Sequence, residues 1–321
     1  MARNQGKVGE QKSAVLRAIP AACKDESTAV DFIEQLRWGS EPACPRCGSV
    51  AVGQMKSARG ERSARYLWRC HDCKRQFTVR IGTIFEDSRI PLRIWCHGFW
   101  RACSSKKGVS ALQISRETGL SYKSALFLMH RIRFAMAGNP AKPRKLEGSV
   151  EADETFVGGK PRHPRHQRKA WSSKAPVFAV VERGGEVRAR TIERVNADTV
   201  KAALREYVKP SAKLYTDEGS HYAWASKPWP GGHATVNHSA GEYARGDAST
   251  NQIEGFFSLL KRGIYGTFHS VSKRHLHRYV AEFEFRYNTR HEDDGARTLE
   301  AIRSAEGKRL KHRMLVESRL A

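Results

Sequence analysis

Two pairs of cysteines constrain the N-terminal part of this chain more sharply than any other feature of its sequence. Cys44 and Cys47 form the first C-x-x-C pair, and Cys70 and Cys73 form the second after 22 intervening residues. Two tight turns at this separation can direct four thiolates at one tetrahedral zinc ion. Free or redox-active thiols are the alternative. Four sulfur ligands leave no open coordination position, so we expect a structural zinc ribbon with no chemistry at its metal.

The charge of the chain indicates its class of partner. The 321 residues include 57 Lys and Arg against 33 Asp and Glu, a formal net charge of +24. An excess of this size favours a polyanion, above all nucleic acid. A membrane partner is excluded because the sequence has no long apolar run and no basic amphipathic anchor. The first nine residues are polar and basic without an apolar signal core, so we expect a cytoplasmic protein.

Residues 88–138 show a helix-turn-helix pattern. Gly119 is expected to form the turn, and the second helix to run over residues 122–136. In a basic chain, Lys123 and Arg131 on this second helix are free to contact DNA. A plain helical hairpin without a role in DNA binding is the alternative.

The second half of the chain has the alternating elements of an α/β domain. Residues 149–157 alternate as a strand that ends at Gly158-Gly159, and two later strands pair across Arg183-Gly184-Gly185, a hairpin signal. A helix, two strands and a final helix follow. Three strands, a helix, two strands and a helix are the order of an RNase-H-like fold, a mixed sheet flanked by helices.

The final helix of this order carries two distinct faces. Ser249 is expected to be its N-cap, and Gln252 follows three residues later in a capping-box spacing. One face is apolar and consists of Ile253, Phe256, Phe257, Leu260 and Ile264. The other is polar and consists of Asn251, Glu254, Ser258 and Lys261. Taken alone, such a polar stripe is an ordinary solvated surface.

Three acidic residues from separate elements change that interpretation. Asp153 lies inside the opening strand, Asp217 ends the fourth strand, and Glu254 lies on the final helix. Carboxylates that repel one another converge sensibly only around cations, and oxygen ligands suit Mg²⁺ or Mn²⁺. Two such ions can activate a water or a 3′-hydroxyl and stabilise the leaving oxygen of a phosphodiester. The alternative functional acids are Glu151, Glu154 and Glu218.

The motifs around these acids carry a family resemblance. They are Glu151-Ala152-Asp153-Glu154-Thr155, Tyr215-Thr216-Asp217-Glu218, Asn251-Gln252-Ile253-Glu254-Gly255-Phe256, Leu260-Lys261-Arg262-Gly263 and Arg286-Tyr287-Asn288-Thr289-Arg290. Together they resemble the DDE transposases of bacterial insertion sequences, in particular the subgroup with an N-terminal zinc ribbon. The resemblance covers roughly residues 25 to 290.

The resemblance implies roles for individual residues. Asp153, Asp217 and Glu254 would bind a pair of Mg²⁺ or Mn²⁺ ions, and Lys261, with Arg262 beside it, would contact phosphate or DNA. Some similar proteins use an asparagine in this helix, so Asn251 would assist or replace Glu254 and contact the DNA.

The resemblance also implies an activity and its partners. Such an enzyme binds the terminal inverted repeats of its own element, nicks the ends to free 3′-hydroxyls, and joins them to target DNA. It works as a homodimer or larger assembly on DNA, in the bacterial cytoplasm with the nucleoid. The alternatives are a catalytically inert DNA-binding regulator and a zinc-ribbon nuclease or resolvase of host DNA.

These expectations divide the chain into segments. They are a basic flexible tail (1–20), a short helix with the zinc ribbon (21–87), the helix-turn-helix region (88–138), a linker (139–148), an α/β catalytic domain of RNase-H-like fold (149–291) and a charged C-terminal tail (292–321).

Overall fold

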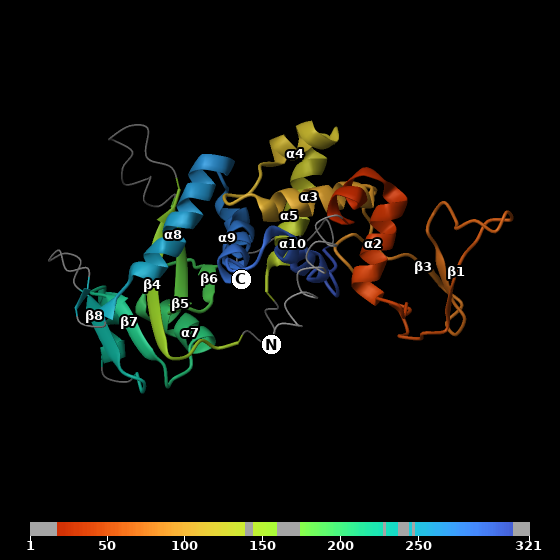
Figure 1. Ribbon diagram of the computed structural model, residues 1–321. Helices are drawn as coiled ribbons and strands as arrows, with labels where there is room; N and C mark the ends of the chain where they lie inside the picture. Colours follow the sequence, from red (N-terminus) through yellow and green to blue (C-terminus); the bar gives the residue numbers. More distant parts are fainter. Residues whose placement is uncertain are drawn as a thin grey trace, which may run out of the picture. The chain divides into compact units, whose positions relative to one another are not determined.

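The chain folds into two compact units. A computed structural model describes residues 18–138, 144–158, 174–226, 229–236, 244–245 and 248–310 (Figure 1). The first unit comprises residues 1–136 and 292–316, and the second comprises residues 137–291 and 317–321. Over the described ranges, no helix combines the length and the apolar character needed to cross a membrane.

The cysteine-rich segment forms a small antiparallel sheet in the first unit. Its strands are β1 (Val52–Gln54), β2 (Trp68–Cys70) and β3 (Gln76–Phe77). Helix α2 (Glu26–Trp38) precedes them. Trp38, the last residue of α2, packs edge-on against Trp68 and Phe77, with ring centroids 5.7 and 5.9 Å away. The apolar core of this small sheet therefore includes a side chain from the preceding helix.

Three helices follow the ribbon in the first unit. They are α3 (Leu92–Ser104), α4 (Ala111–Thr118) and α5 (Tyr122–Met136). Ser110 caps α4 by accepting a hydrogen bond from the backbone N–H of Gln113. Gly119 ends α4 in the left-handed conformation, with φ of 73°, and so redirects the chain into α5. The turn and the second helix lie where the sequence pattern places them.

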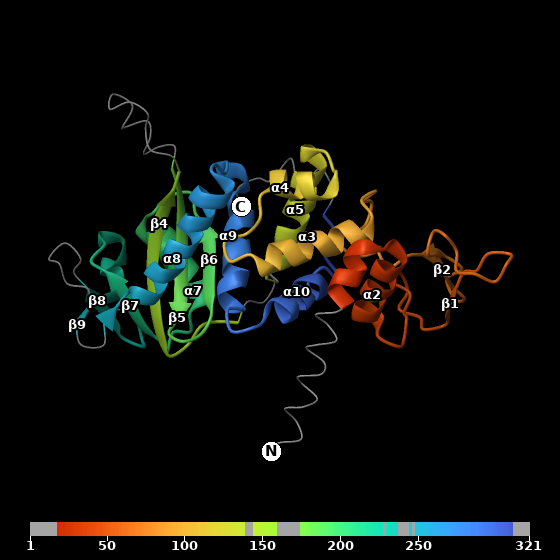
Figure 2. The same cartoon turned by 45° about the horizontal axis from the view of Figure 1, so that its top comes forward.

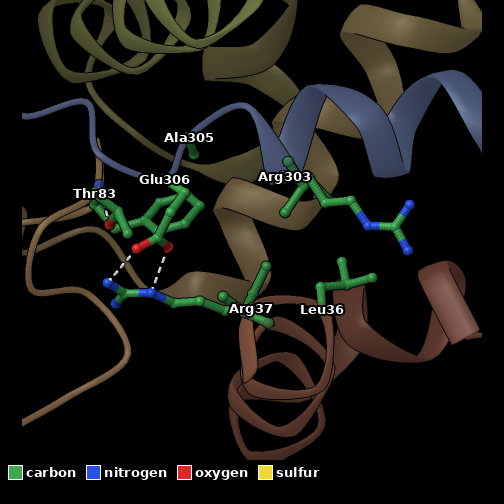
Figure 3. Close-up of a pocket in the computed structure, with 9 residues that line it drawn as sticks. Leu36, Arg37, Thr83, Arg303, Ala305 and Glu306 are labelled. Carbon is green, nitrogen blue, oxygen red and sulfur yellow. Dashed lines mark hydrogen bonds and ion pairs between the residues drawn. The ribbon is translucent and has the colours of Figure 1, made fainter. Parts of the chain in front are cut away.

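The segment expected to be a charged C-terminal tail is folded as far as residue 310. Helix α10 (Asp294–Arg303) belongs to the first unit and packs against α3 and α2 (Figure 2). Glu306 forms an ion pair with Arg37 and an antiparallel bridge with Thr83. These residues line a hollow of about 220 Å³ between α2 and the chain after α10 (Figure 3). This segment is folded, and not the expected tail, because α10 has apolar residues to bury, among them Ala301 and Ile302.

The second unit is built on a mixed sheet. Its strands are β4 (Ser149–Val157), β5 (Ala175–Glu182), β6 (Val187–Thr191), β7 (Lys213–Asp217) and β8 (His233–Val236), in the spatial order β6-β5-β4-β7-β8. β4, β5 and β6 pair antiparallel, whereas β7 runs parallel to both β4 and β8. A mixed sheet with helices, as expected from the order of elements, is confirmed.

Helices and short elements complete the second unit. They are α7 (Ala197–Tyr207), the 3₁₀ helix η2 (Ser220–Ser226), β9 (Ala244–Arg245), β10 (Ala248–Ser249), α8 (Asn251–Gly263), the π-helical turn η4 (Ile264–Phe268) and α9 (Lys273–Asn288). The end of the expected linker also enters the fold, since Leu146 is buried in the core beneath α7.

Both faces of the sheet are covered by helices, and β5 shows why. Phe178 and Val180 pack into the core that includes α7, while Val177, Ala179 and Val181 pack into the core that includes α8 and α9. A strand buried on both faces is apolar at nearly every position, as β5 is. On β4 the same alternation places Asp153 and Val157 on the α8 side and Val150 and Ala152 on the α7 side. α8 therefore crosses the face that carries Asp153 (Figures 1 and 2).

The outer strand β6 is closed by side chains of α9. Asn288 accepts a hydrogen bond from the backbone N–H of Val187 at 2.8 Å and donates one to its carbonyl at 3.1 Å. The Glu284 carboxyl accepts from the backbone N–H of Ala189 at 3.1 Å. Outward-facing backbone groups of this edge strand are thus paired within the unit.

The packing of α8 on α9 predicts how two glycines of α8 respond to substitution by alanine. A Cβ atom at Gly263 would overlap the buried Phe283 ring, whereas a Cβ at Gly255, on the same helix, meets nothing within 4 Å. We expect Gly263→Ala to destabilise the protein by about 1–3 kcal/mol through overpacking. Gly255→Ala should be neutral or stabilising, by up to about 1 kcal/mol, because alanine favours a helix. Thermal unfolding followed by circular dichroism measures both; equal unfolding midpoints would contradict this account of the packing.

Candidate active site

The four ribbon cysteines form a quartet with the geometry of a zinc site. Their sulfur atoms all lie within 4.8 Å of one another. The Sγ atoms of Cys44 and Cys73 are 3.7 Å apart, and those of Cys47 and Cys70 are 3.6 Å apart. A tetrahedral zinc ion with bonds of about 2.3 Å places its sulfur ligands roughly 3.8 Å apart. The quartet therefore fits one zinc ion with four protein ligands.

Zinc content tests this quartet directly. We expect the purified protein to hold about one zinc ion per chain, and Cys44→Ser or Cys70→Ser to remove it, because three remaining thiolates bind zinc less tightly. Cys103→Ser is the matched control, since Cys103 is a buried thiol outside the quartet. Elemental analysis by mass spectrometry gives the content. Retention of zinc by both ribbon variants would contradict the site.

The three acids expected to act together line one hollow in the second unit. Asp153 comes from β4, Asp217 from the end of β7, and Glu254 from the first turn of α8. The hollow measures about 500 Å³, and its described lining is Asp153, Glu154, Thr155, Asp217, Glu254, Phe257, Ser258, Lys261 and Arg262. Acidic and basic side chains therefore border the same space, as the polar stripe on the helix suggested.

Strand register explains how residues far apart in the sequence meet here. β4 and β7 run parallel, and Glu151 on β4 is paired with Tyr215 on β7. Two residues later on each strand come Asp153 and Asp217, on the same face and at the same end of the sheet. α8 covers that face and brings Glu254 to it.

Asp153 is the electrostatically strained member of the group. Burial, and after it the negative charges of Glu154, Asp217 and Glu254, raise the pKa of Asp153 to about 8. A hydrogen bond from the backbone N–H of Glu154 to Asp153 Oδ1, at 2.7 Å, opposes the shift. Repulsion among these carboxylates is the condition that a bound cation relieves.

Local hydrogen bonds orient the other two acids. The backbone N–H of Gly219 donates to Asp217 Oδ1 at 3.0 Å, and the Thr250 hydroxyl donates to Glu254 Oε1 at 3.1 Å. Carboxylate oxygens are the ligands that Mg²⁺ prefers, and the hollow has room for hydrated ions. Among the described residues, the ribbon quartet is the one group of three or more His, Cys, Asp or Glu side chains whose ligand atoms all lie within 4.8 Å of one another, so the three acids are more widely spaced. A cation among the acids would thus complete its shell with water or phosphate oxygens.

A fourth acid, Glu154, lies beside this group with partners that the sequence analysis missed. The Tyr222 hydroxyl donates to Glu154 Oε2 at 3.0 Å, and His221 Nε2 lies 3.0 Å from Oε1, an ionic contact without hydrogen-bond alignment. Burial raises the pKa of Glu154, while His221 and Tyr222 oppose the shift. Both partners lie on η2, a few residues after Asp217, and that proximity in sequence was the available signal.

The start of α8 differs from the expected capping box. Asn251 is exposed at the first position of α8 and is outside the described lining of the hollow. The N-cap of α8 is Thr250, not Ser249, and its side chain makes no cap hydrogen bond. The side chain of Gln252 accepts a hydrogen bond from the backbone N–H of Gly184 at 3.0 Å, in the turn between β5 and β6, and so does not cap α8. The predicted capping box is therefore wrong.

The two basic residues expected on the second helix of the helix-turn-helix pattern have opposite environments. Lys123 is exposed near the start of α5. Arg131 is buried, with 3% of its surface exposed, and donates hydrogen bonds to the carbonyls of Ile84, Glu86 and Leu310. The prediction of a DNA contact by Arg131 is wrong, because its two terminal nitrogens donate to carbonyls from two distant segments of the first unit.

Comparisons with known proteins agree with this arrangement. Residues 145–288 match the ISXO2-like transposase domain, and residues 24–76 match the transposase zinc-ribbon domain. An uncharacterized protein in transposable element ISH50 of Halobacterium salinarum is 30% identical over 275 residues, covering 81% of this chain and 90% of the relative. The chain belongs to the ISXO2-like transposase family. In this transposase the matched ribbon contains the cysteine quartet, and the matched transposase domain contains the acid-lined hollow.

The strained carboxylate makes a prediction about stability. Without added divalent ions, we expect Asp153→Asn to unfold at a higher temperature than wild type, because the amide cannot ionise and so avoids the cost of burying this carboxyl. The folded pKa of Asp153 is about 8 against an ordinary 3.8, so ionisation costs stability as pH rises between these values. The advantage of the variant should therefore grow over this window and level off above it.

Added Mn²⁺ should make the wild type unfold at a higher temperature than Asp153→Asn. The ion stabilises the wild type by binding its folded state, whereas the variant lacks one of the ligands for the ion. Glu182→Gln is the control, because Glu182 pairs with Arg144 outside the hollow. A variant less stable than wild type at pH 8 without added ions would contradict the prediction.

Proposed function

We propose that this chain is a DDE transposase that cleaves and joins DNA at the ends of its own element. The observation that carries the proposal is the convergence of Asp153, Asp217 and Glu254 on one hollow that Lys261 and Arg262 also line. The membership in a transposase family supports it. The mixed sheet, the acids on β4 and β7 and the acid on α8 also support an RNase-H-like domain as its scaffold.

In this proposal the three acids hold two Mg²⁺ or Mn²⁺ ions. Bound ions of this kind supply activation of a water or a 3′-hydroxyl and stabilisation of the leaving oxygen. The protein contributes orientation: Gly219 fixes the carboxylate of Asp217, and Thr250 fixes that of Glu254. Lys261 and Arg262 bind the phosphates of the strand that enters the hollow, since their positive charges border it.

DNA recognition belongs to the first unit in this proposal. We assign binding of the terminal inverted repeats to the zinc ribbon and to the α4–α5 pair, where Tyr122 and Lys123 are exposed. The formal charge of +24 favours contact with the phosphate backbone. Asn251, exposed at the start of α8, would contact DNA beside the hollow. Because two ends and a target must be held together, the active form is a homodimer or larger assembly on DNA.

A cleavage assay on the ends of the element tests the assignment. Asp153→Ala and Asp217→Ala should reduce cleavage and joining in Mg²⁺ by about a thousandfold or more, because acids acting as a unit fail together. Binding of labelled end DNA, measured by mobility shift, should remain. Glu182→Ala is the matched control on the adjacent strand and should retain activity.

Each other outcome has a distinct meaning. Cleavage by either variant at the wild-type rate refutes the assignment of the acids. A wild type that binds the ends and never cleaves them is a regulator, and one that cleaves without joining ends to target DNA is a nuclease.

A further inference from the structure

Glu151 connects the two elements that carry the first and third acids. It lies two residues before Asp153 on the same face of β4, and only 1% of its surface is exposed. Its Oε2 atom accepts hydrogen bonds from the backbone N–H groups of Gln252 at 2.9 Å and Ile253 at 3.1 Å. A carboxylate on the strand therefore binds the first turn of α8.

This contact replaces the cap that α8 lacks locally. The first backbone N–H groups of a helix have no partner within it, and a side chain at the N-cap ordinarily supplies one. Here the hydroxyl of the N-cap residue, Thr250, donates to Glu254 and makes no cap hydrogen bond. Glu151 supplies the acceptor from another element, and its negative charge is favourable at the positive end of the helix dipole.

Arg183 holds Glu151 from the opposite side. Its Nε donates to Glu151 Oε1 at 2.9 Å, and an NH2 nitrogen donates to the carbonyl and hydroxyl of Ser249 at 2.9 and 3.1 Å. The guanidinium lies 4.0 Å from the ring centroid of Tyr215, on β7. One network thus joins the strands of Asp153 and Asp217 to the residues that precede α8.

We propose that Glu151 is a positioning residue, which docks the first turn of α8 onto β4 and so sets where Glu254 stands relative to Asp153. The inference rests on the proposed function, because it concerns the same acids. Glu254 follows Ile253 directly, so any displacement of the amides that Glu151 binds displaces the third acid as well. Catalytic constellations require placement within fractions of an ångström by such supporting contacts.

Glu151→Gln tests the inference with little change in volume. Its amide group presents hydrogens where the carboxylate presents an oxygen, so either α8 or Arg183 loses an acceptor. We expect faster hydrogen exchange in a peptide spanning residues 249–256, measured by mass spectrometry on the full chain. We also expect about tenfold weaker Mn²⁺ binding, measured by calorimetry, and partial rescue of DNA cleavage at high Mn²⁺.

Two further variants complete the design. Glu182→Gln makes the same chemical change on β5, outside the network, and should match wild type in every measurement. If Glu151→Gln fails to fold, Arg183→Lys tests the same network, because lysine cannot reproduce the paired contacts to Glu151 and Ser249. Arg183→Lys should, like Glu151→Gln, show faster hydrogen exchange in residues 249–256 and weaker Mn²⁺ binding than wild type.

The outcomes separate this inference from the proposed function. Faster exchange together with weaker Mn²⁺ binding supports it. Unchanged exchange, or unchanged Mn²⁺ affinity measured well below the unfolding temperature, overturns it and leaves the proposed function intact. A wild-type protein that binds no Mn²⁺ and cleaves no DNA overturns both.

Discussion

Repulsion between buried carboxylates is the constraint that the second unit has to withstand. Asp153 sits where burial and three negative neighbours disfavour its charge, and no flexible scaffold would keep those groups close together. The sheet resists because β5, next to β4, is buried by apolar side chains on both faces. Packing on the two sides of the sheet thus stabilises an arrangement that is unfavourable around the acids on β4 and β7.

Much of this arrangement could be read from the sequence, because it depends on short-range regularities. The spacing of the four ribbon cysteines predicts the zinc quartet that their sulfur atoms form: Cys44, Cys47, Cys70 and Cys73. Alternation along β4 separates Asp153 from Glu154 by the face each side chain occupies. The apolar positions of α8 recur at helical spacing and are buried. In each case the information lies in the spacing of residues within one short segment or between two motifs of fixed spacing.

The features that the sequence did not reveal depend on contacts between distant segments. Arg131 is a basic residue on a helix expected to bind DNA, yet its side chain donates to carbonyls of residues far away in the chain. The sequence at the start of α8 matches a capping box. The acceptor for the backbone N–H of Gln252 is nevertheless Glu151, about a hundred residues earlier in the chain. Glu306 and Arg37 pair in the same way. Local propensity cannot show which remote group will compete for a donor.

The side chains of α9 along β6 have a consequence for how copies of this protein meet. An unpaired outer strand offers its backbone as a template on which another polypeptide can continue the sheet. Here Asn288 and Glu284 already bind three such groups, the N–H and carbonyl of Val187 and the N–H of Ala189. A second subunit could pair with these groups only after the α9 side chains release them, so addition of a further strand to β6 is disfavoured.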